Sequence, residues 1–201
     1  MVTSLYIGFA LVLVVGVVFL VSCARRPSPV RSRTWPGPDD RRHEGVVNFG
    51  IVTPNLWRGS QPTAEGFRNL EKAGVKTIVN LRSDHDDLEQ LSDTNMKYIR
   101  IPMRAWNANQ GNDAQLLLVM MTLRDLLKNP DCYPVFVHCA AGRDRTGYTV
   151  AAYRQVFEDW KPDDAVAEMI DFRFNTLWFK NPGYLRKLDV PKMHALLKRA
   201  P

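Results

Sequence analysis

Residues 138–147, HCAAGRDRTG, place a cysteine six positions before an arginine. This segment comes directly after the apolar run 134–137. Such a run is consistent with a buried strand, and the residues after it then form a loop to a helix that begins at Arg145. Backbone N–H groups at a helix start lack partners within the helix and attract an anion. Gly142 permits positive φ, so residues 139–145, here called the cysteine loop, can form a ring of N–H donors that fits a phosphate.

Cys139 would lie at the bottom of this ring, where the N–H groups and Arg145 favour its thiolate. A thiolate can attack phosphorus in line with the leaving oxygen and form a cysteinyl-phosphate. Arg145 can bind two phosphate oxygens with its planar guanidinium and stabilise the transition state. We therefore expect catalytic roles for Cys139, Arg145 and Thr146, whose hydroxyl can help the sulfur to leave, and a supporting role for His138. The residues expected to bind the phosphate are Ala140, Ala141, Gly142, Arg143, Asp144 and Arg145.

The alternative interpretation of the motif is an inert buried cysteine, which leaves the histidine, glycine and threonine around it without explanation. The cysteine loop resembles the His-Cys-x5-Arg-Ser/Thr loop of cysteine-dependent protein tyrosine and dual-specificity phosphatases, above all their compact bacterial and fungal-plant members. Residues 55–62 (NLWRGSQP), 74–82 (GVKTIVNLR) and 101–106 (IPMRAW) resemble further segments of that family. The resemblance covers about residues 49–174, and it implies a phosphoester hydrolase with a cysteinyl-phosphate intermediate.

The leaving group in such a reaction needs a proton donor. The resemblance implies an aspartate from a movable loop upstream of the cysteine loop, and Asp113 is the only carboxylate in the corresponding segment, residues 103–113. An N-cap of the following helix would also explain an aspartate at this position. Asp86 and Asp87, which follow the strand expected over residues 75–81, are the alternative candidates for the acid.

Three further side chains are candidates for the site. Arg58 and Arg82 each follow a strand, and we expect them at the surface or in structural ion pairs. Cys132 precedes Cys139 by seven residues; we expect a semi-buried thiol, and the alternative is a protective disulfide with Cys139. No cysteine or histidine pair has the spacing of zinc ligands, so neither a metal nor another cofactor is expected.

Strands alternate with helices from Val46 onward, which predicts an α/β fold with a central, mostly parallel sheet of the protein-tyrosine-phosphatase type, flanked by helices. In such sheets, ligands bind where strands end and helices begin. Helices are expected to open at Thr63, at Asn112 or Asp113, at Arg145 and at Pro162, with a last one over about residues 192–199. Strands are expected over residues 46–52, 55–58, 75–81, 97–102 and 135–138.

The chain is expected to have three parts. Residues 1–24 contain no charged side chain and form a membrane anchor or a lipoprotein-type signal, because residues 5–24 are long and apolar enough for a helix that crosses a bilayer. Residues 25–44 are a Pro/Arg-rich linker, and residues 45–201 are a catalytic domain like that of dual-specificity phosphatases.

The flanks of the apolar segment bear on its orientation. Arginines follow the segment and none precedes it, so the positive-inside rule favours a single span with the catalytic domain in the cytoplasm. Leu20–Cys23 resembles a lipobox, so the alternative is an extracytoplasmic lipoprotein acylated at Cys23. A cleaved signal peptide is a third possibility, disfavoured by the length of the apolar run.

Charge limits the choice of substrate. Residues 45–201 contain 21 basic and 18 acidic side chains, so the domain is too close to neutral to be expected to bind nucleic acid. The cysteine loop offsets Arg143 with Asp144, which favours phosphorylated proteins over polyanionic substrates. Membrane tethering instead favours a phosphoinositide or an inositol (pyro)phosphate. A membrane-tethered module that binds phosphate without turnover is the third hypothesis.

Overall fold

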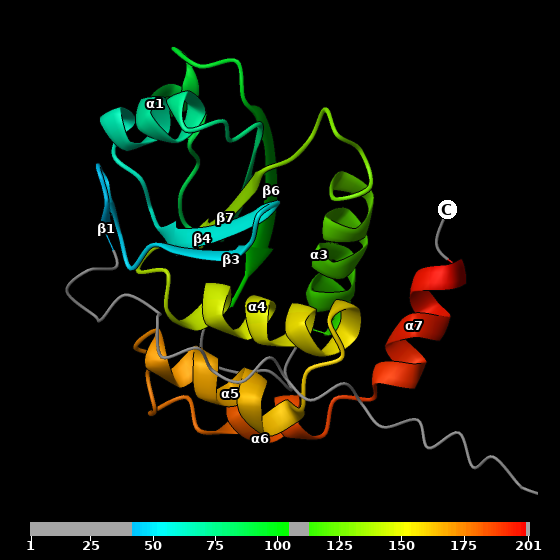
Figure 1. Cartoon of the computed structure of the whole chain (residues 1–201). Helices are drawn as coiled ribbons and strands as arrows, with labels where there is room; N and C mark the ends of the chain where they lie inside the picture. The colour runs from blue at the N-terminus through cyan, green and yellow to red at the C-terminus, as the bar shows by residue number, and fades with distance from the viewer. Residues whose placement is uncertain (1–41, 105–112, 200–201) are drawn as a thin grey trace, which may run out of the picture.

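The computed structural model describes residues 42–104 and 113–199 (Figure 1). Its centre is a five-stranded mixed sheet with the order β3-β4-β7-β5-β6, in which only β3 and β4 pair antiparallel. The expectation of an α/β fold with a mostly parallel sheet is confirmed. The strands are β3 (Gly50–Thr53), β4 (Leu56–Ser60), β5 (Thr77–Arg82), β6 (Lys97–Met103) and β7 (Val135–Cys139), beside a short hairpin of β1 (Arg42–His43) and β2 (Val46–Val47).

Helices cover both faces of this sheet, as Figure 1 shows. The α1 helix and the β1–β2 hairpin lie on one face, and the other face carries the larger hydrophobic core beneath α3 and α4. The helices are α1 (Ala64–Lys72), α2 (Leu88–Leu91), α3 (Asp113–Leu126), α4 (Asp144–Phe157), α5 (Pro162–Asp171), α6 (Lys180–Arg186) and α7 (Val190–Arg199).

The alternation of side chains along β7 divides the site between the two faces. All five residues of β7 are buried, because the strand lies in the middle of the sheet. Val137 and Cys139 belong to the core on the α4 side. Phe136 and His138 point the other way, and the His138 ring packs edge-on against Phe67 of α1. Neighbouring residues of a strand point to opposite faces, so the nucleophile candidate and the histidine before it have different surroundings.

Most expected elements are present, with instructive differences. Thr63 caps α1 by accepting a hydrogen bond from the Gly66 N–H, as expected. The strand expected over residues 46–52 is wrong as a single element, because Asn48 takes a φ of 52° and splits it. Pro102 lies inside β6 rather than at its end, which the sheet tolerates because β6 is an edge strand. The sequence patterns missed α2 and α6.

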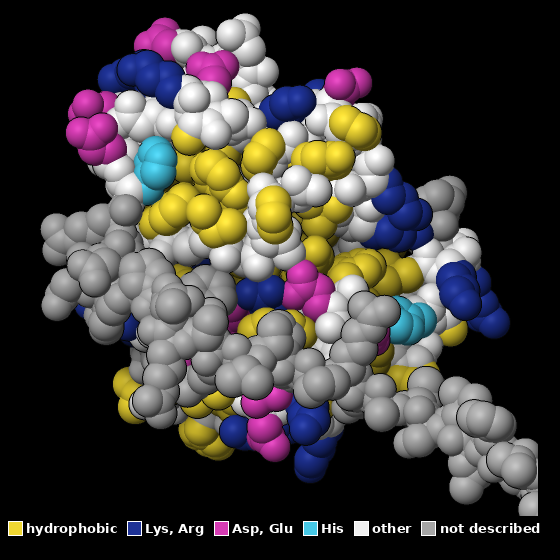
Figure 2. Space-filling model, in the orientation of Figure 1, with side chains coloured by type: hydrophobic (Ala, Val, Ile, Leu, Met, Phe, Trp, Pro, Cys, Tyr) yellow, Lys and Arg dark blue, Asp and Glu magenta, His cyan; other side chains and the backbone are white. Residues whose placement is uncertain are grey.

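The expected membrane anchor at residues 5–24 and nearly all of the linker lie outside the described residues. Within residues 42–104 and 113–199, no helix is long and apolar enough to cross a bilayer. On the face seen in Figure 2, the described Lys and Arg side chains are interspersed with Asp and Glu. This face of the described chain therefore carries no extended field of a single sign.

Candidate active site

The cysteine loop connects the end of β7 to α4 in the middle of the sheet. Cys139 is 2% exposed, and Gly142 turns the chain with a φ of 65°. A Cβ atom at Gly142 would lie 2.4 Å from the carbonyl carbon of Gly59 and 2.6 Å from the nitrogen of Ser60. Only glycine fits this position, both because of its backbone conformation and because the end of β4 approaches so closely.

Arg58 of β4 holds the loop from below. It is fully buried, its Nη2 donates to the Gly142 carbonyl at 2.8 Å, and its guanidinium lies 3.9 Å from the Phe172 ring centroid. The expectation of a surface position is wrong, because parallel pairing of Arg58 with Val137 brings the side chain under the loop. The C=O and N–H of a trans peptide point in opposite directions. The hydrogen bond from Arg58 to the Gly142 carbonyl therefore directs the Arg143 N–H towards the loop interior.

Asn48 and Gln61 hold two further carbonyls of the loop. The Gln61 N–H donates to the Ala140 carbonyl at 3.1 Å, and Asn48 Nδ2 donates to the carbonyls of Gly142 at 3.0 Å and Ala141 at 3.4 Å. By the same peptide geometry, the N–H groups of Ala141 and Gly142 turn inward. No pattern in the sequence indicated Asn48, whose backbone takes a positive φ of 52°.

Several buried polar atoms around Cys139 have no hydrogen-bond partner among residues 42–104 and 113–199. They are Nε of Arg143, Nε of Arg145 and Oγ1 of Thr146. Buried polar atoms in proteins almost always have partners, so their concentration at one helix start is what a binding site for an anion would show. The Asp144 carboxylate, by contrast, accepts from the Asn175 N–H at 2.8 Å, so its side chain is engaged by the segment after α5.

His138 is fixed from the opposite face of the sheet by Asp87. Both side chains are fully buried, and His138 Nε2 lies 2.9 Å from Asp87 Oδ2. Gln61 Nε2 donates to the other carboxylate oxygen at 2.7 Å. An ionised carboxylate only accepts hydrogen bonds, so Nε2 carries the proton. This position argues against Asp87 as the proton donor, because it lies on the α1 side of the sheet and Cys139 does not.

The other two candidates for the acid lie in different surroundings. Asp86 pairs with Arg100 of β6 at 3.6 Å and accepts from the Leu88 N–H at 2.9 Å, so its side chain is engaged at the start of α2. Asp113 is exposed at the first residue of α3, and it lines the same pocket as Tyr184 of α6. Burial and the nearby Asp113 raise the pKa of Tyr184 to about 12, so this hydroxyl keeps its proton.

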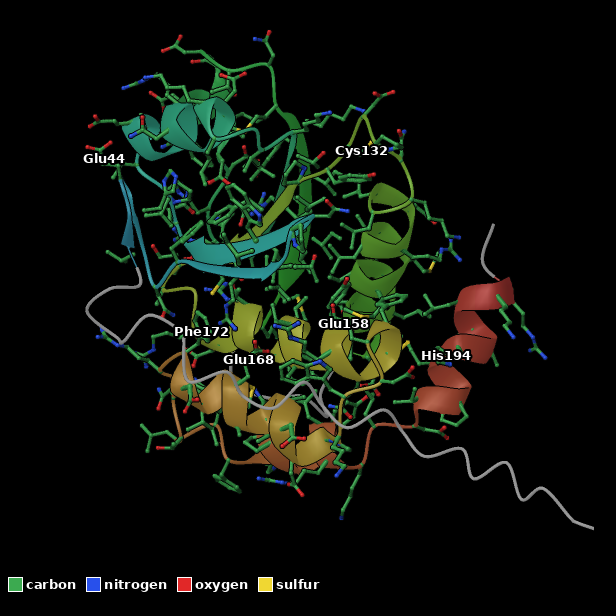
Figure 3. The ribbon with its side chains drawn as sticks, in the orientation of Figure 1. Glu44, Cys132, Glu158, Glu168, Phe172 and His194 are labelled. Atoms are coloured by element: carbon green, nitrogen blue, oxygen red, sulfur yellow. The ribbon has the colours of Figure 1, made fainter. Side chains whose placement is uncertain are left out.

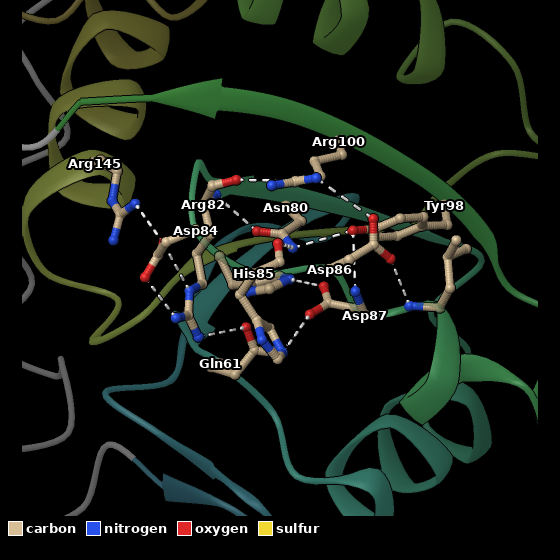
Figure 4. A network of polar contacts seen from close by, with 12 residues as sticks. Gln61, Asn80, Arg82, Asp84, His85, Asp86, Asp87, Tyr98, Arg100 and Arg145 are labelled. Carbon is tan, nitrogen blue, oxygen red and sulfur yellow. Dashed lines mark hydrogen bonds and ion pairs between the residues drawn. The ribbon is translucent and has the colours of Figure 1, made fainter.

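Asp84, in the loop after β5, is a residue of the site that the sequence reasoning missed. Its Oδ1 lies 3.6 Å from Nη1 of Arg145, and its Oδ2 lies 2.9 Å from Nη2 of Arg82 (Figure 4). The expectation of an ion pair at Arg82 is therefore confirmed. The only signal in the sequence was that Asp84 follows closely after the end of β5, a strand next to β7.

These observations describe a loop with inward N–H groups around a buried cysteine, and a sequence model of the tyrosine phosphatase family matches residues 45–195. The chain belongs to the tyrosine phosphatase family. The resemblance noted in the sequence is therefore confirmed.

Relatives in this family include the dual specificity protein phosphatase TpbA of Pseudomonas aeruginosa, 30% identical over 73% of this chain and 62% of that protein. The chain thus spans about three fifths of TpbA. A probable tyrosine-protein phosphatase of Dictyostelium discoideum, DG1060, is 30% identical over 73% of this chain and 89% of that protein. The crystal structure of P. aeruginosa TpbA matches with a TM-score of 0.67 and 27% identity, over 79% of this chain and 94% of that chain.

Cys132 does not belong to the phosphatase site. It is buried, accepts a hydrogen bond from Lys97 Nζ at 3.2 Å, and precedes β7 at the end opposite to Cys139 (Figure 3). A strand rises about 3.3 Å per residue, so the two cysteines lie farther apart than the roughly 7 Å that a disulfide spans. The alternative of a protective disulfide is wrong, and the expected thiol is free, although it is buried rather than semi-buried.

Proposed function

We propose that residues 45–201 form the catalytic domain of a protein tyrosine or dual-specificity phosphatase that works through a cysteinyl-phosphate. The main support is that Cys139 is buried at the bottom of the cysteine loop. Asn48, Arg58 and Gln61 donate hydrogen bonds to the carbonyls of this loop and hold them pointing outward. The inward N–H groups can hold the three non-bridging oxygens of a phosphate above the sulfur.

In the first step, the Cys139 thiolate attacks phosphorus as the bond from phosphorus to the leaving oxygen breaks. Arg145 binds two equatorial oxygens, and its hydrogen bonds and those of the loop N–H groups strengthen as charge moves onto these oxygens. The departing oxygen takes the proton of Asp113. In the second step, water attacks phosphorus, the sulfur–phosphorus bond breaks, and Asp113 receives the proton of the water. The Thr146 hydroxyl donates to the sulfur as it leaves.

Asp113 is our assignment for the proton donor, because Asp87 is buried against His138 and Asp86 is paired with Arg100. If so, Asp113→Asn lowers kcat by about 10²-fold for an alkyl phosphate, whose leaving group needs a proton. The loss should be much smaller for an activated aryl phosphate. Equal losses for both substrates would show that Asp113 only caps α3.

The names of relatives support a phosphorylated protein as the substrate. The first curated relative is named a dual specificity protein phosphatase, and a cysteine-to-serine variant of TpbA has been crystallised with phosphotyrosine. An inositol (pyro)phosphate is the second candidate, because an Arabidopsis thaliana relative, 26% identical, is named an inositol diphosphatase. Asp144 and Asp84, both close to the loop, favour the first candidate.

The direct test is Cys139→Ser, which should abolish hydrolysis of an aryl phosphate and keep the binding of inorganic phosphate. Unchanged turnover would overturn the thiolate mechanism. The wild type should hydrolyse a phosphotyrosyl peptide faster than a phosphoseryl peptide, a phosphoinositide or an inositol phosphate, and EDTA should not change the rate. Phosphate binding without turnover of any of these would instead indicate a binding module.

For the rest of the chain, we propose that residues 5–24 anchor the enzyme to a membrane as a single span, with the catalytic domain in the cytoplasm. The full chain should then float with lipid vesicles, and a chain without residues 1–24 should not. A variant Cys23→Ser tests the lipoprotein alternative, because only an acylated chain would lose membrane binding with this cysteine.

A further inference from the structure

The edge of the cysteine loop carries a negative charge on an adjacent loop. Asp84 is 62% exposed, and it lies between the guanidinium groups of Arg145 and Arg82. Arg82 binds both of its carboxylate oxygens, Nε at 3.3 Å and Nη2 at 2.9 Å. This two-point contact fixes the carboxylate in place. Asp84 is therefore a permanent neighbour of the side chain that is proposed to bind the substrate's phosphate.

The carboxylate of Asp84 also stays ionised. Its hydrogen bonds with Arg82, together with the charges of Arg82 and Arg145, hold the pKa of Asp84 well below its ordinary value. Any phosphate that binds Arg145 must approach this negative charge at every pH suitable for an assay.

Asp84 has a second effect, on Arg82. The Arg82 side chain is 18% exposed and that of Arg145 is 12% exposed, so both are accessible to a small anion. Without Asp84, the two guanidinium groups would form a doubly positive surface suited to a substrate with a second phosphate. With Asp84 between them, the charge of Arg82 is already neutralised. The same loop adds Asp86, whose partner is Arg100, and Asp87, which is buried against His138.

We infer that Asp84 is a specificity-determining residue, which restricts the site to phosphomonoesters in weakly charged surroundings and disfavours polyanionic substrates. The inference rests on the proposed phosphatase function and deepens it. The substrate class that fits is a phosphotyrosine flanked by neutral residues, and an inositol polyphosphate is disfavoured. The penalty that Asp84 imposes on the phosphate itself is common to all substrates, whereas the repulsion of further charges grows with their number.

Asp84→Asn tests this inference, with Asp86→Asn as the matched control, because both changes remove one negative charge from the same loop. Two phosphotyrosyl peptides are compared that differ only in neutral or acidic residues beside the phosphotyrosine. Asp84→Asn should raise the ratio of kcat/KM for the acidic over the neutral peptide by roughly three- to tenfold. The gain should shrink at high salt, which screens exposed charges, and the control should keep the wild-type ratio.

A companion measurement does not depend on turnover. In the Cys139→Ser background, Asp84→Asn should tighten the binding of inositol hexakisphosphate more than that of inorganic phosphate. An unchanged ratio in both assays would overturn the inference, and an equal fall of kcat for both peptides would show that Asp84 only positions Arg145. A wild type that hydrolyses no phosphoester, combined with the expected shift in binding, would refute the proposed function and leave the role of Asp84 intact.

Discussion

The two ends of α4 each carry an arginine, Arg154 buried and Arg145 half-buried, and the two arginines differ in their partners. Near its C-terminal end, Arg154 donates to both oxygens of Glu168, at 3.0 and 2.7 Å, and also pairs with Glu158. Its guanidinium lies 4.2 Å from the centre of the Trp160 ring. At the N-terminal end, Arg145 has only the distant, exposed carboxylate of Asp84, and its Nε has no partner among the described residues.

The difference separates a charge that holds the fold from a charge that can bind a ligand. A buried charge without a partner of opposite charge destabilises the fold. At the C-terminal end of α4, carboxylates from α5 and from the end of α4 itself supply such partners. The N-terminal end does not, although Cys139, Thr146 and Arg143 are also buried or half-buried there. We infer that the N-terminal end is completed by the substrate's phosphate.

The largest expected effect on activity comes from Arg145→Lys. Lysine cannot reproduce the two parallel hydrogen bonds of guanidinium to phosphate, so kcat/KM should fall by about 10³-fold. The free energy of unfolding should change by less than about 1 kcal/mol, since Asp84, the ion-pair partner of Arg145 among the described residues, is exposed. Kinetics with an aryl phosphate measure kcat/KM, and urea denaturation measures the free energy of unfolding. A large loss of stability with little loss of activity would show that Arg145, like Arg154, stabilises the fold rather than binding a ligand.

Glu168→Gln should give the reverse result at the other end. It leaves a buried guanidinium without its two-point partner, and the free energy of unfolding should fall by about 3–5 kcal/mol. The kcat/KM of the folded protein should stay near the wild-type value. Asp163→Asn is the control, because it breaks an exposed ion pair with Arg186 and should cost less than about 1 kcal/mol. Equal destabilisation by the two variants would contradict the structural role of Glu168.

Gly142→Ala should reduce kcat/KM by about 10²-fold, because a Cβ would push the cysteine loop away from β4 and misplace the phosphate. Gly74→Ala is the matched control: Gly74 also has positive φ, at 100°, but no atom lies within 4 Å of the added Cβ. It should cost stability through backbone strain of about 1–2 kcal/mol and leave kcat/KM unchanged. Comparable activity losses in both variants would show that close packing against β4 is unimportant.

The smallest of these effects is expected for Asp87→Asn. The amide cannot accept from both His138 and Gln61 as the carboxylate does, and kcat/KM should fall by about tenfold, the equivalent of one hydrogen bond. Asp86→Asn, on the neighbouring residue, should have no effect on hydrolysis of a neutral aryl phosphate. A fall for Asp86→Asn as large as that for Asp87→Asn would show that the His138 contact has no special role.

The sequence was informative where the site is local. The cysteine loop, the apolar strand before it and the helix after it are contiguous, so spacing and residue types predicted them. Arg58 was misjudged because its burial depends on the pairing of β4 with β7, which no local pattern encodes. Asn48 and Asp84 reach the loop from other segments of the chain for the same reason. The arginine partners inside the fold, such as Glu168, likewise depend on how α5 packs against α4.

The central claim is that the N-terminal end of α4 holds a phosphoryl group on Cys139 during turnover. Rapid mixing with an aryl phosphate, a denaturing quench within one turnover and peptide mass spectrometry test it directly. We predict one added phosphoryl group on the peptide that contains Cys139, located on the cysteine, and its absence in Cys139→Ser. A burst of released phenol with the phosphoryl group on another residue, or with no adduct at all, would contradict the account.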